Sequence, residues 1–440
     1  MKRLKKGAYF GLAVLAAIGL SLSPAGAVDK VYTLSKSIQE ALANNWSLQA
    51  KKEKIEGAVY ANKRAKTDFM PAFKTSYSYT RLDGERISPA TPIAPERPLN
   101  TQDNYLWKGT ITQPLFTGFA LTSAYELSKL GIDQSEMELD LEKLDLVLRV
   151  KESYFNILKA DKAVEVTQKA VEGFSSHVKV AKSFYDVGMI PINDLLKAEV
   201  ELSNAQYELV RSQNAAKITR ANFNVVLARP VNEPVSVEDI VAYEPETGNF
   251  ETYLEKALIN RPEIKTIELN LLQTDQQIRL AKSKYYPEVA LNYDYIREGD
   301  HFEVAGSEFH DSGRWQVTAA LTWTFWEWGK TGYDVREKES LRTELMKTRE
   351  SLKDSISLQI KQAILDLEQE EKNIPTTRKA VEQGEENLRV SQERYKAQVT
   401  TSTEVLDAQT LLTQARVNYY GALYDRNLAK ARLLRSMGEY

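Results

Sequence analysis

The sequence lacks cysteine altogether and contains few histidines, which limits the chemistry it can perform. Without cysteine there is neither a disulfide framework nor a thiol nucleophile. The 3 histidines, His177, His301 and His310, form no HExxH pattern, and no phosphate-binding loop or nucleophile elbow accompanies them. Basic patches of the kind that bind nucleic acid are also missing. We therefore expect no enzymatic activity, no cofactor, no bound metal and no nucleic-acid partner.

Long apolar runs are missing too, except near the N-terminus. The run from Ala8 to Leu20 is shorter than the ~20 residues that a membrane-spanning helix needs. Basic residues precede it, and Ala25-Gly26-Ala27 offers small residues for cleavage. We predict a secretory signal peptide over residues 1–27, with a membrane anchor as the alternative. Since no cysteine follows the cleavage site, we expect no N-terminal lipid anchor.

Proline is absent and glycine is scarce from Phe119 to Val187. Apolar residues recur there at every seventh position, and the same series returns 210 residues later. The first series is Val150, Ile157, Val164, Val171, Val178 and Tyr185, and the second is Ile360, Leu367, Ile374, Val381, Leu388 and Tyr395. This spacing predicts two long helices with coiled-coil packing. At about 1.5 Å per residue each would span roughly 100 Å, far more than a bilayer. A fibrous rod or a partner-binding coiled coil is the alternative.

The two heptad series belong to a duplication of the chain. Pro71 and Pro287 lie 216 positions apart in segments that repeat each other without a gap. Leu42, Asn44, Ala65, Lys66, Tyr77, Tyr79 and Arg81 recur as Leu258, Asn260, Ala281, Lys282, Tyr293, Tyr295 and Arg297. This period exceeds that of solenoid repeats, which indicates two copies of one large unit. We predict a first repeat over residues 28–229, a linker over residues 230–249 and a second repeat over residues 250–440.

Each repeat also contains two segments in which apolar and polar residues alternate, as they do in membrane β-strands. The apolar positions include Phe73, Tyr77 and Tyr79, then Tyr105, Trp107 and Ile111, then Val289, Leu291, Tyr293 and Tyr295, and finally Trp315, Val317, Leu321, Trp323 and Phe325. The segments approach the ~9–11 residues of a tilted spanning strand. Soluble hairpins packed on the helices are the alternative.

Four strands cannot close a barrel, and an open sheet in lipid would leave its edge amides unpaired. Two copies of the chain would give eight strands around an interior filled by side chains, whereas three would give twelve strands and room for a pore. A transport function therefore favours a homotrimer.

Four motifs occur in order along the two repeats. The strand-to-helix junctions read Gln113-Pro114-Leu115-Phe116-Thr117-Gly118 and Trp323-Thr324-Phe325-Trp326-Glu327-Trp328-Gly329, and the helix tips are residues 185–198 and 395–408. Together they resemble the TolC family of outer-membrane efflux proteins over essentially the whole mature chain. The resemblance implies a mainly α protein: a trimer with a long coiled-coil α-helical barrel of twelve helices, a 12-stranded outer-membrane β-barrel, and an equatorial belt built from residues 230–262 and the C-terminus.

The same resemblance implies the function. The protein would be the exit duct of a tripartite efflux or type I secretion system in the outer membrane of a Gram-negative bacterium. Its partners would be outer-membrane lipid, a periplasmic adaptor (membrane fusion protein) and an inner-membrane pump of the RND, ABC or MFS type, which supplies the energy. Drugs, metal ions and polypeptides are all compatible cargoes. The alternative is a soluble periplasmic coiled-coil adaptor of an export system.

The resemblance also places functional residues at the helix tips. It implies a tunnel entrance at Asp194, Tyr395, Thr400, Glu404 and Asp407, and adaptor docking at Asp186, Val187, Gly188, Met189, Ala397, Gln398 and Val399. Because Thr400 stands where the family has a basic residue, we expect no arginine–aspartate latch. Three copies of Glu404 and Asp407 would still form a ring of six carboxylates that attracts cations.

Local propensities give the tip residues structural roles as well. Gly188 suits a left-handed helix end, Pro191 suits a first helical turn, and Thr401 with Glu404 has the spacing of a capping box. Gln398 replaces the glycine of the first tip, which disfavours a second docking groove of the same shape. Pro375 predicts a bend in the second long helix near the belt.

Overall fold

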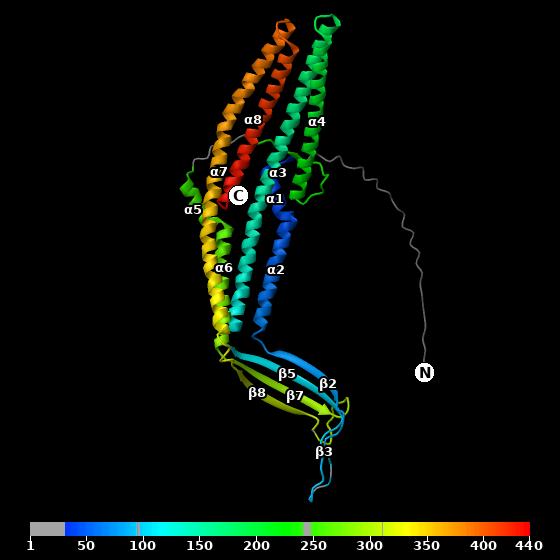
Figure 1. Cartoon of the computed structure of the whole chain (residues 1–440), viewed down its shortest axis with the longest axis vertical. Coiled ribbons are helices and arrows are strands. Elements are labelled where there is room, and N and C mark those ends of the chain that lie inside the picture. The colour runs from blue at the N-terminus through cyan, green and yellow to red at the C-terminus, as the bar shows by residue number, and fades with distance from the viewer. Residues whose placement is uncertain (1–30, 94, 96, 241–247, 310) are drawn as a thin grey trace, which may run out of the picture.

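The chain is elongated, with long helical hairpins at one end and a four-stranded sheet at the other (Figure 1). The computed structural model describes residues 31–93, 95, 97–240, 248–309 and 311–440. The predicted signal peptide, His310 and residues 241–247 of the predicted linker lie outside the described residues. In the part of the chain that is described, no helix is both long enough and apolar enough to cross a membrane.

Two long helices of equal length run from the sheet to separate tips, and a shorter helix returns from each tip. They are α3 (Ala120–Asp186, 67 residues), α4 (Ile192–Val226, 35 residues), α7 (Lys330–Lys396, 67 residues) and α8 (Ser402–Ser436, 35 residues). α3 pairs with α4 and α7 pairs with α8, so that each half of the chain contributes one helical hairpin (Figure 1). At about 1.5 Å per residue the long helices span roughly 100 Å. The predicted pair of long helices is confirmed.

Shorter helices lie beside the halves of α3 and α7 that are nearest the sheet. They are α1 (Leu34–Asn44), α2 (Trp46–Thr67), α5 (Phe250–Asn260) and α6 (Pro262–Lys282), the last followed by a 3-10 turn, η1 (Ser283–Tyr285). α2 packs against α3, and α6 packs against both α3 and α7. Asn45 starts α2 by accepting a hydrogen bond from the Ser47 backbone N–H, and Pro262 at the start of α6 has no N–H to satisfy. The short helices thus extend each hairpin toward the sheet.

Both halves of the chain contribute two strands each to one antiparallel sheet of four strands. Its strands are β2 (Ala72–Arg81), β5 (Asp103–Thr117), β7 (Glu288–Gly299) and β8 (Arg314–Thr322), in the order β2-β5-β7-β8. Two small pairs accompany it: β1 (Val31–Tyr32) with β6 (Ser236–Val237), and β3 (Ile87–Ser88) with β4 (Arg97–Pro98). The four predicted strands are confirmed, and β2 and β8 are the sheet edges.

The predicted end of the last strand is wrong. Trp323 and Phe325 lie beyond β8, which ends at Thr322. Thr322 pairs with Glu288, the first residue of β7, so the neighbouring strand offers no ladder partner for the residues that follow. Alternation alone could not place this end, because Trp323 and Phe325 continue the apolar pattern.

The register separates an aromatic face of the sheet from a polar one. Tyr77 lies opposite Trp107, and Tyr293 lies opposite Val317. On the other face, Asp294 lies 3.0 Å from the Lys108 ammonium. The predicted alternation is therefore present in the folded sheet, with polar groups paired across strands on one face and aromatic rings gathered on the other.

The core runs along the hairpins, where the heptad residues meet. Val150 and Ile157 of α3 and Ile360 of α7 are fully buried. The two series differ at the tips, because Tyr395 is 4% exposed whereas its counterpart Tyr185 is 40% exposed. The predicted seam therefore reaches the tip of the second hairpin but not that of the first.

Pro375 lies inside α7 without ending it. The contacts of α7 with α5 involve the stretch from Ile356 to Leu367, whereas Ile374 packs on Ala422 and Leu423 of α8. Tyr420 borders both this contact and the cluster that contains Val235 of the predicted belt, so the proline lies near the belt, where we expected it. The bend itself stays a prediction.

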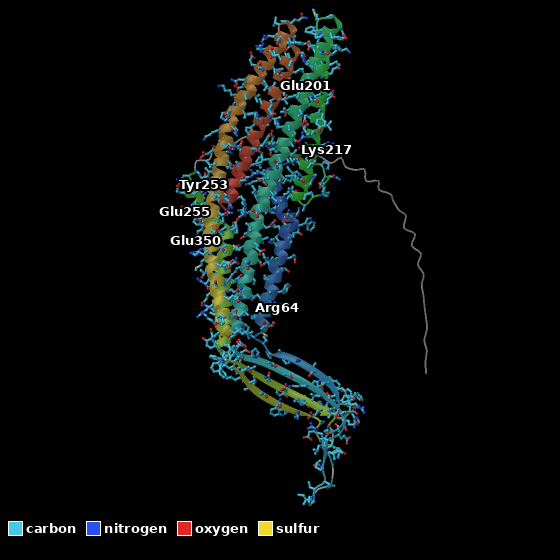
Figure 2. The ribbon with its side chains drawn as sticks, viewed as in Figure 1. Arg64, Glu201, Lys217, Tyr253, Glu255 and Glu350 are labelled. Atoms are coloured by element: carbon cyan, nitrogen blue, oxygen red, sulfur yellow. The ribbon has the colours of Figure 1, made fainter. Side chains whose placement is uncertain are left out.

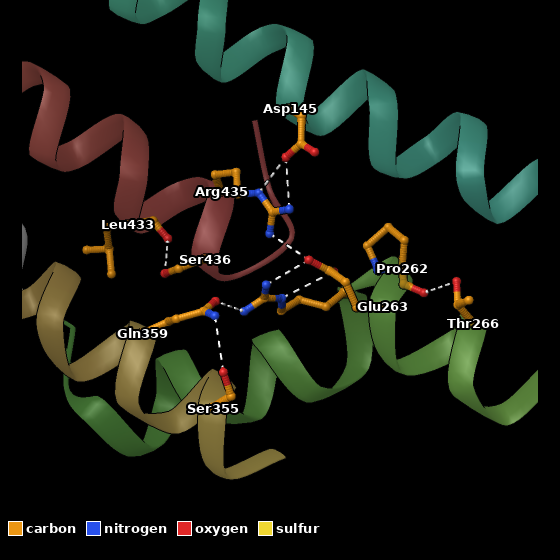
Figure 3. A network of polar contacts seen from close by, with 10 residues as sticks. Asp145, Pro262, Glu263, Thr266, Ser355, Gln359, Leu433, Arg435 and Ser436 are labelled. Atoms are coloured by element: carbon orange, nitrogen blue, oxygen red, sulfur yellow. Dashed lines mark hydrogen bonds and ion pairs between the residues drawn. The ribbon is translucent and has the colours of Figure 1, made fainter. Parts of the chain in front are cut away.

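A polar network fastens the end of α8 midway along the molecule (Figure 3). Arg435 donates hydrogen bonds to Asp145 of α3, at 2.9 Å, and to Glu263 of α6, at 2.8 Å. Arg261 donates to the same Glu263, at 2.7 Å, and to Gln359 of α7, at 2.8 Å. Burial acts to raise the pKa of Glu263, but the hydrogen bond and charge of Arg261 and the charge of Arg435 outweigh it and lower the pKa to about 2. We call these residues the equatorial network.

Candidate functional site

The two tips end in the same backbone turn. At the first tip, Gly188 has a φ of +76°, and its N–H bonds to the Tyr185 carbonyl while the Met189 N–H bonds to the Phe184 carbonyl, both at 2.8 Å. This is the paired bonding of a Schellman motif, and it confirms the left-handed helix end predicted at Gly188.

The second tip adopts this turn without a glycine. Gln398 has a φ of 60°, and the N–H groups of Gln398 and Val399 bond to the carbonyls of Tyr395 and Arg394 at 2.9 Å each. A left-handed backbone costs a residue with a Cβ about 1–2 kcal/mol. The backbone of the second tip therefore matches that of the first, although its sequence does not.

The starts of the return helices differ from two predictions. Pro191 precedes α4 as its N-cap and does not lie in the first helical turn. Thr401 precedes α8 but makes no side-chain capping bond, so the predicted capping box is wrong. The reason is that Glu404 has other partners: Arg394 donates to it at 3.1 Å, and the Thr400 hydroxyl also donates to it. A carboxylate held by a guanidinium does not turn back to the helix start.

A groove of about 810 Å³ lies between α4 and α8 at the tips. Asp194 and Glu201 line it from α4, and Asp407 lines it from α8. Lys197 is the one lining cation among the described residues. Glu201 marks the position of the groove near the tip end of α4 (Figure 2). The structure thus brings together the predicted entrance residues Asp194 and Asp407, while Glu404 accepts hydrogen bonds from Thr400 and Arg394.

Tyr395, the fifth predicted entrance residue, lies inside the contact between the hairpins. Its ring centroid is 4.9 Å from that of His177 and 5.5 Å from that of Phe184, both on α3. Burial raises the pKa of the Tyr395 phenol, and the negative charge of Asp194 raises it further. Tyr395 thus joins the second hairpin to the first.

The residues predicted to dock an adaptor are all exposed: Asp186, Val187, Gly188, Met189, Ala397, Gln398 and Val399. Three of them are apolar side chains at the extreme tips, with exposures of 67% for Val187, 58% for Met189 and 63% for Val399. The Gln398 amide donates to the Met189 thioether sulfur at 2.9 Å and so joins the tips. Exposed apolar residues in one place are typical of a surface that contacts another protein.

Sequence reasoning missed three contacts at the tips, those of Arg394, His177 and Met189, although Met189 is itself a predicted docking residue. Arg394 supplies the positive charge that the sequence lacks at Thr400, but it does so from ten positions before Glu404, on the other side of the turn. His177 and Met189 contact the second hairpin across separations of 225 and 209 residues. The heptad series, which passes through Val178 and not His177, gave no indication of these contacts.

Exposed aromatic side chains surround the junctions between sheet and helices. The exposed fractions are 52% for Trp323, 78% for Phe325, 66% for Trp326 and 85% for Trp328, and Phe119 reaches 57% at the other junction. Such rings are typical of the aromatic girdle at a membrane interface.

Both junctions contain two successive left-handed residues, one of them glycine. These are Gly118 with Phe119 and Trp328 with Gly329. At Gly118, a Cβ would lie 2.4 Å from the Ser283 carbonyl oxygen. The first junction therefore requires glycine at this position.

No group of three or more histidine, aspartate and glutamate side chains could hold a metal ion within the ranges that the structure covers. The chemistry available at the tips is therefore that of carboxylates, one buried imidazole and exposed apolar side chains.

The comparisons with known proteins agree with this geometry. The family described as outer membrane efflux protein matches residues 37–229 and 253–439. Outer membrane protein TolC of Escherichia coli (strain K12) is 21% identical over 457 aligned positions, which cover 96% of this chain and 85% of that protein.

Among solved structures, the Campylobacter jejuni CmeC outer membrane channel has a TM-score of 0.79 at 15% identity, over 92% of this chain and 85% of that chain. The open state of the Neisseria gonorrhoeae MtrE outer membrane channel has a TM-score of 0.73 at 18% identity, over 92% of this chain and 89% of that chain. Both share the fold described above.

Proposed function

Since the chain belongs to the outer membrane efflux protein family, we propose how its parts serve as the exit duct that this family provides. The expectation of an outer-membrane location, with a long periplasmic portion in a Gram-negative bacterium, is confirmed. The exit duct is also confirmed, so the soluble adaptor is set aside. In our proposal the sheet lies in the membrane, the hairpins extend into the periplasm, and substrate enters at the tips.

The observation that best supports assembly into an oligomer is that the four-stranded sheet is open. β2 and β8 are both edge strands, and each presents unpaired backbone groups that hydrocarbon cannot satisfy. Pairing β8 of one chain with β2 of the next, three times, closes a barrel of twelve strands with room for a pore. The same arrangement would cover the exposed apolar side chains of Val200, Tyr207, Ile218 and Val225 along α4. We therefore propose a homotrimer.

The tips would receive the remaining partners. Val187, Met189 and Val399 offer an apolar surface for a periplasmic adaptor, or membrane fusion protein. The chain itself contains no phosphate-binding loop, so an inner-membrane pump of the RND, ABC or MFS type would supply the energy. In this arrangement the protein works as a passive duct and not as an enzyme.

The entrance would be lined by carboxylates of the tip groove. Three copies of Asp194 and Asp407 around one opening attract cations, whereas Glu404 is already paired with Arg394 in each chain. This pairing supports different roles for the two acids, which the sequence analysis placed together in one ring. Asp407 should dominate cation selectivity, and Glu404 should contribute less.

Single-channel recordings in planar bilayers test this ranking. Asp407→Asn should weaken the block by multivalent cations added on the periplasmic side by about tenfold, a change equivalent to about 1.4 kcal/mol. Glu404→Gln should change the block less, and Arg394→Gln should strengthen it because it frees Glu404. Raising the salt concentration should shrink these differences, since charges interact over a Debye length of about 10 Å at 0.1 M. If Asp407→Asn and the double variant with Glu404→Gln both retain wild-type selectivity and block, the entrance lies elsewhere.

A further inference from the structure

One buried imidazole joins the two hairpins near their tips. His177 of α3 is 7% exposed, and its Nε2 shares a hydrogen bond with the Ser402 hydroxyl at 2.7 Å. Ser402 is the first residue of α8, and Tyr395, whose ring lies beside that of His177, belongs to the last turn of α7. The imidazole therefore contacts both arms of the second hairpin at the point where α7 turns into α8.

The surroundings of His177 oppose a positive charge. Its neighbours one turn away on α3 are uncharged: Gly173, Phe174, Val180 and Ala181. α7 presents the neutral Tyr395 ring, and α8 presents the Ser402 hydroxyl at its N-terminus, where the helix dipole repels a cation. α4 contributes Asp194, whose charge acts on the Tyr395 phenol. Within the described ranges, His177 forms no ion pair, and burial alone lowers its pKa.

On the side of His177 away from the tip, α3, α4 and α8 meet in an apolar cluster whose residues do not titrate. Phe174 of α3 and Leu406 of α8 pack together with Ala170 and Ala198. Toward the tip, the Phe184 ring contacts that of Tyr395 at a tilt of 49°, and Gln398 bonds to Met189. His177 is thus the group in this part of the contact whose charge can change between pH 5 and 8.

We infer that His177 is a positioning residue of the entrance: its neutral form holds the α7–α8 tip against α3, and its protonation releases the tip. This inference rests on the proposed function, in which the tips form the entrance. It adds a control of the entrance by acid that involves neither an arginine–aspartate latch nor the carboxylate groove.

The sign follows from linkage. Burial lowers the pKa of His177 from its ordinary value of 6.5 while the tips are in contact, so the separated tips bind the proton more tightly. The stability that His177 gives to the contact is therefore complete above pH 6.5 and is lost as the pH falls below that value. Because one proton is bound per chain, the ratio of separated to joined tips can rise at most about tenfold per pH unit.

Spin labels can read the tip separation directly, because the chain has no native cysteine. Cysteines replacing Val187 and Val399 would lie at opposite tips, and both positions are exposed. The full-length double-cysteine chain is co-expressed with an excess of the cysteine-free wild-type chain and is then spin-labelled, so that pulsed distance measurements read pairs within one chain. We expect one short distance at pH 8 and a growing population of longer distances between pH 6.5 and pH 5.

Two substitutions at position 177 separate charge from contact. His177→Gln keeps a hydrogen-bonding amide that does not titrate, and should give the same distances at every pH. His177→Phe removes the bond to Ser402, and should raise the separated population at every pH without a transition. His301→Gln is the matched control, because this exposed histidine lies at the far end of the molecule and should leave the wild-type transition unchanged.

The outcomes distinguish this inference from the proposed function. A wild type without a transition, or a His177→Gln variant with the wild-type transition, overturns the role of His177 even if Asp407→Asn changes the cation block as expected. A transition that depends on His177 but leaves bilayer conductance unchanged supports the His177 contact and contradicts the placement of the entrance at the tips.

Discussion

At the scale of single residues, Gly188 and Gln398 show one backbone turn built from two side chains. Both residues are left-handed, and the space around Gly188 is open, since nothing in the described chain lies within 4 Å of an added Cβ. A substitution at Gly188 would therefore be strained by its backbone and not by a clash within the chain. The same open space is where a docking partner would lie.

We predict that Gly188→Val destabilises the first tip by about 1–2 kcal/mol, the cost of a left-handed backbone for a residue with a Cβ. Outer-membrane trimers should persist, because the tip is far from the sheet, but adaptor co-purification and export should be lost. Gly188→Asn is the matched control, since asparagine tolerates this conformation and adds less bulk at the Cβ. Normal export by a well-expressed Val variant would refute a docking role for this turn.

The identity of the residue explains the left-handed turn at the first tip but not the same turn at the second. Glycine predicts a left-handed helix end by itself, whereas the turn at Gln398 depends on backbone bonds to Tyr395 and Arg394 and on the contact with Met189. The capping box failed for a similar reason, because Glu404 is held by Arg394. Spacing along the chain cannot reveal which of several partners a carboxylate takes.

At the scale of helices and strands, the equatorial network decides how the hairpins are joined. It links α3, α6, α7 and α8 through Asp145, Glu263, Gln359 and Arg435, together with Arg261 at the start of α6. Arg261 is 3% exposed, so loss of its carboxylate partner would leave a buried charge without compensation.

We predict that Glu263→Gln lowers the free energy of unfolding by roughly 2–3 kcal/mol at pH 7, because it leaves Arg261 and Arg435 without their shared carboxylate. The folded-state pKa of about 2 lies below the ordinary 4.5, so the stability from Glu263 is present above pH 4.5 and is lost as the pH falls toward 2. Thermal melting curves should therefore show a difference between wild type and variant that shrinks below pH 4.5.

Glu255→Gln supplies the control, because Glu255 lies on the exposed side of α5 (Figure 2). Its melting temperature should match that of the wild type at each pH. An equally large loss in this control, or a Glu263→Gln difference that does not change with pH, would contradict the role assigned to the network.

The sequence predicts the elements well where a period is sustained and poorly where it stops. The proline-free stretch from Phe119 to Val187 locates α3 within one residue at each end, and the heptads within it identify the residues that pack in the core. The end of β8 was misplaced, because only the start of β7 decides how far the edge strand pairs. The resemblance implied a belt that includes Arg261 and the C-terminal residues, but it did not indicate their partners Asp145 on α3 and Gln359 on α7, since periodicity treats these helices as separate.

At the scale of the whole molecule, the strand order leaves an assembly problem that a single chain cannot solve. The sheet begins with β2 and ends with β8, each pairing on one side only. The division of the chain at residues 230–249 stays a prediction, but both halves contribute one edge. Closure must therefore join unlike edges, which in a trimer repeats the same contact three times.

A pair of introduced cysteines tests this closure. Ser78→Cys in β2 and Gln316→Cys in β8 lie on the polar face of the two edge strands. Oxidation of the double variant in mild detergent should yield a covalent trimer on a denaturing gel, with a dimer as intermediate, because each disulfide joins neighbouring chains. Either single-cysteine variant should give no trimer. A product cross-linked only within one chain would contradict the trimer.

The uninterrupted length of α7 has a mechanical consequence. From its equatorial contact at Leu367 to its last residue, Lys396, the helix is a lever arm of about 45 Å. A tilt of about 5° around that contact, small for a hinge motion, would displace the tip by about 4 Å, more than the width of a water molecule. A small rotation of α7 at Leu367 is therefore enough to move its tip by several ångströms. A weak force applied at the tip also has the largest turning effect on the helix, because it acts at the greatest distance from that contact.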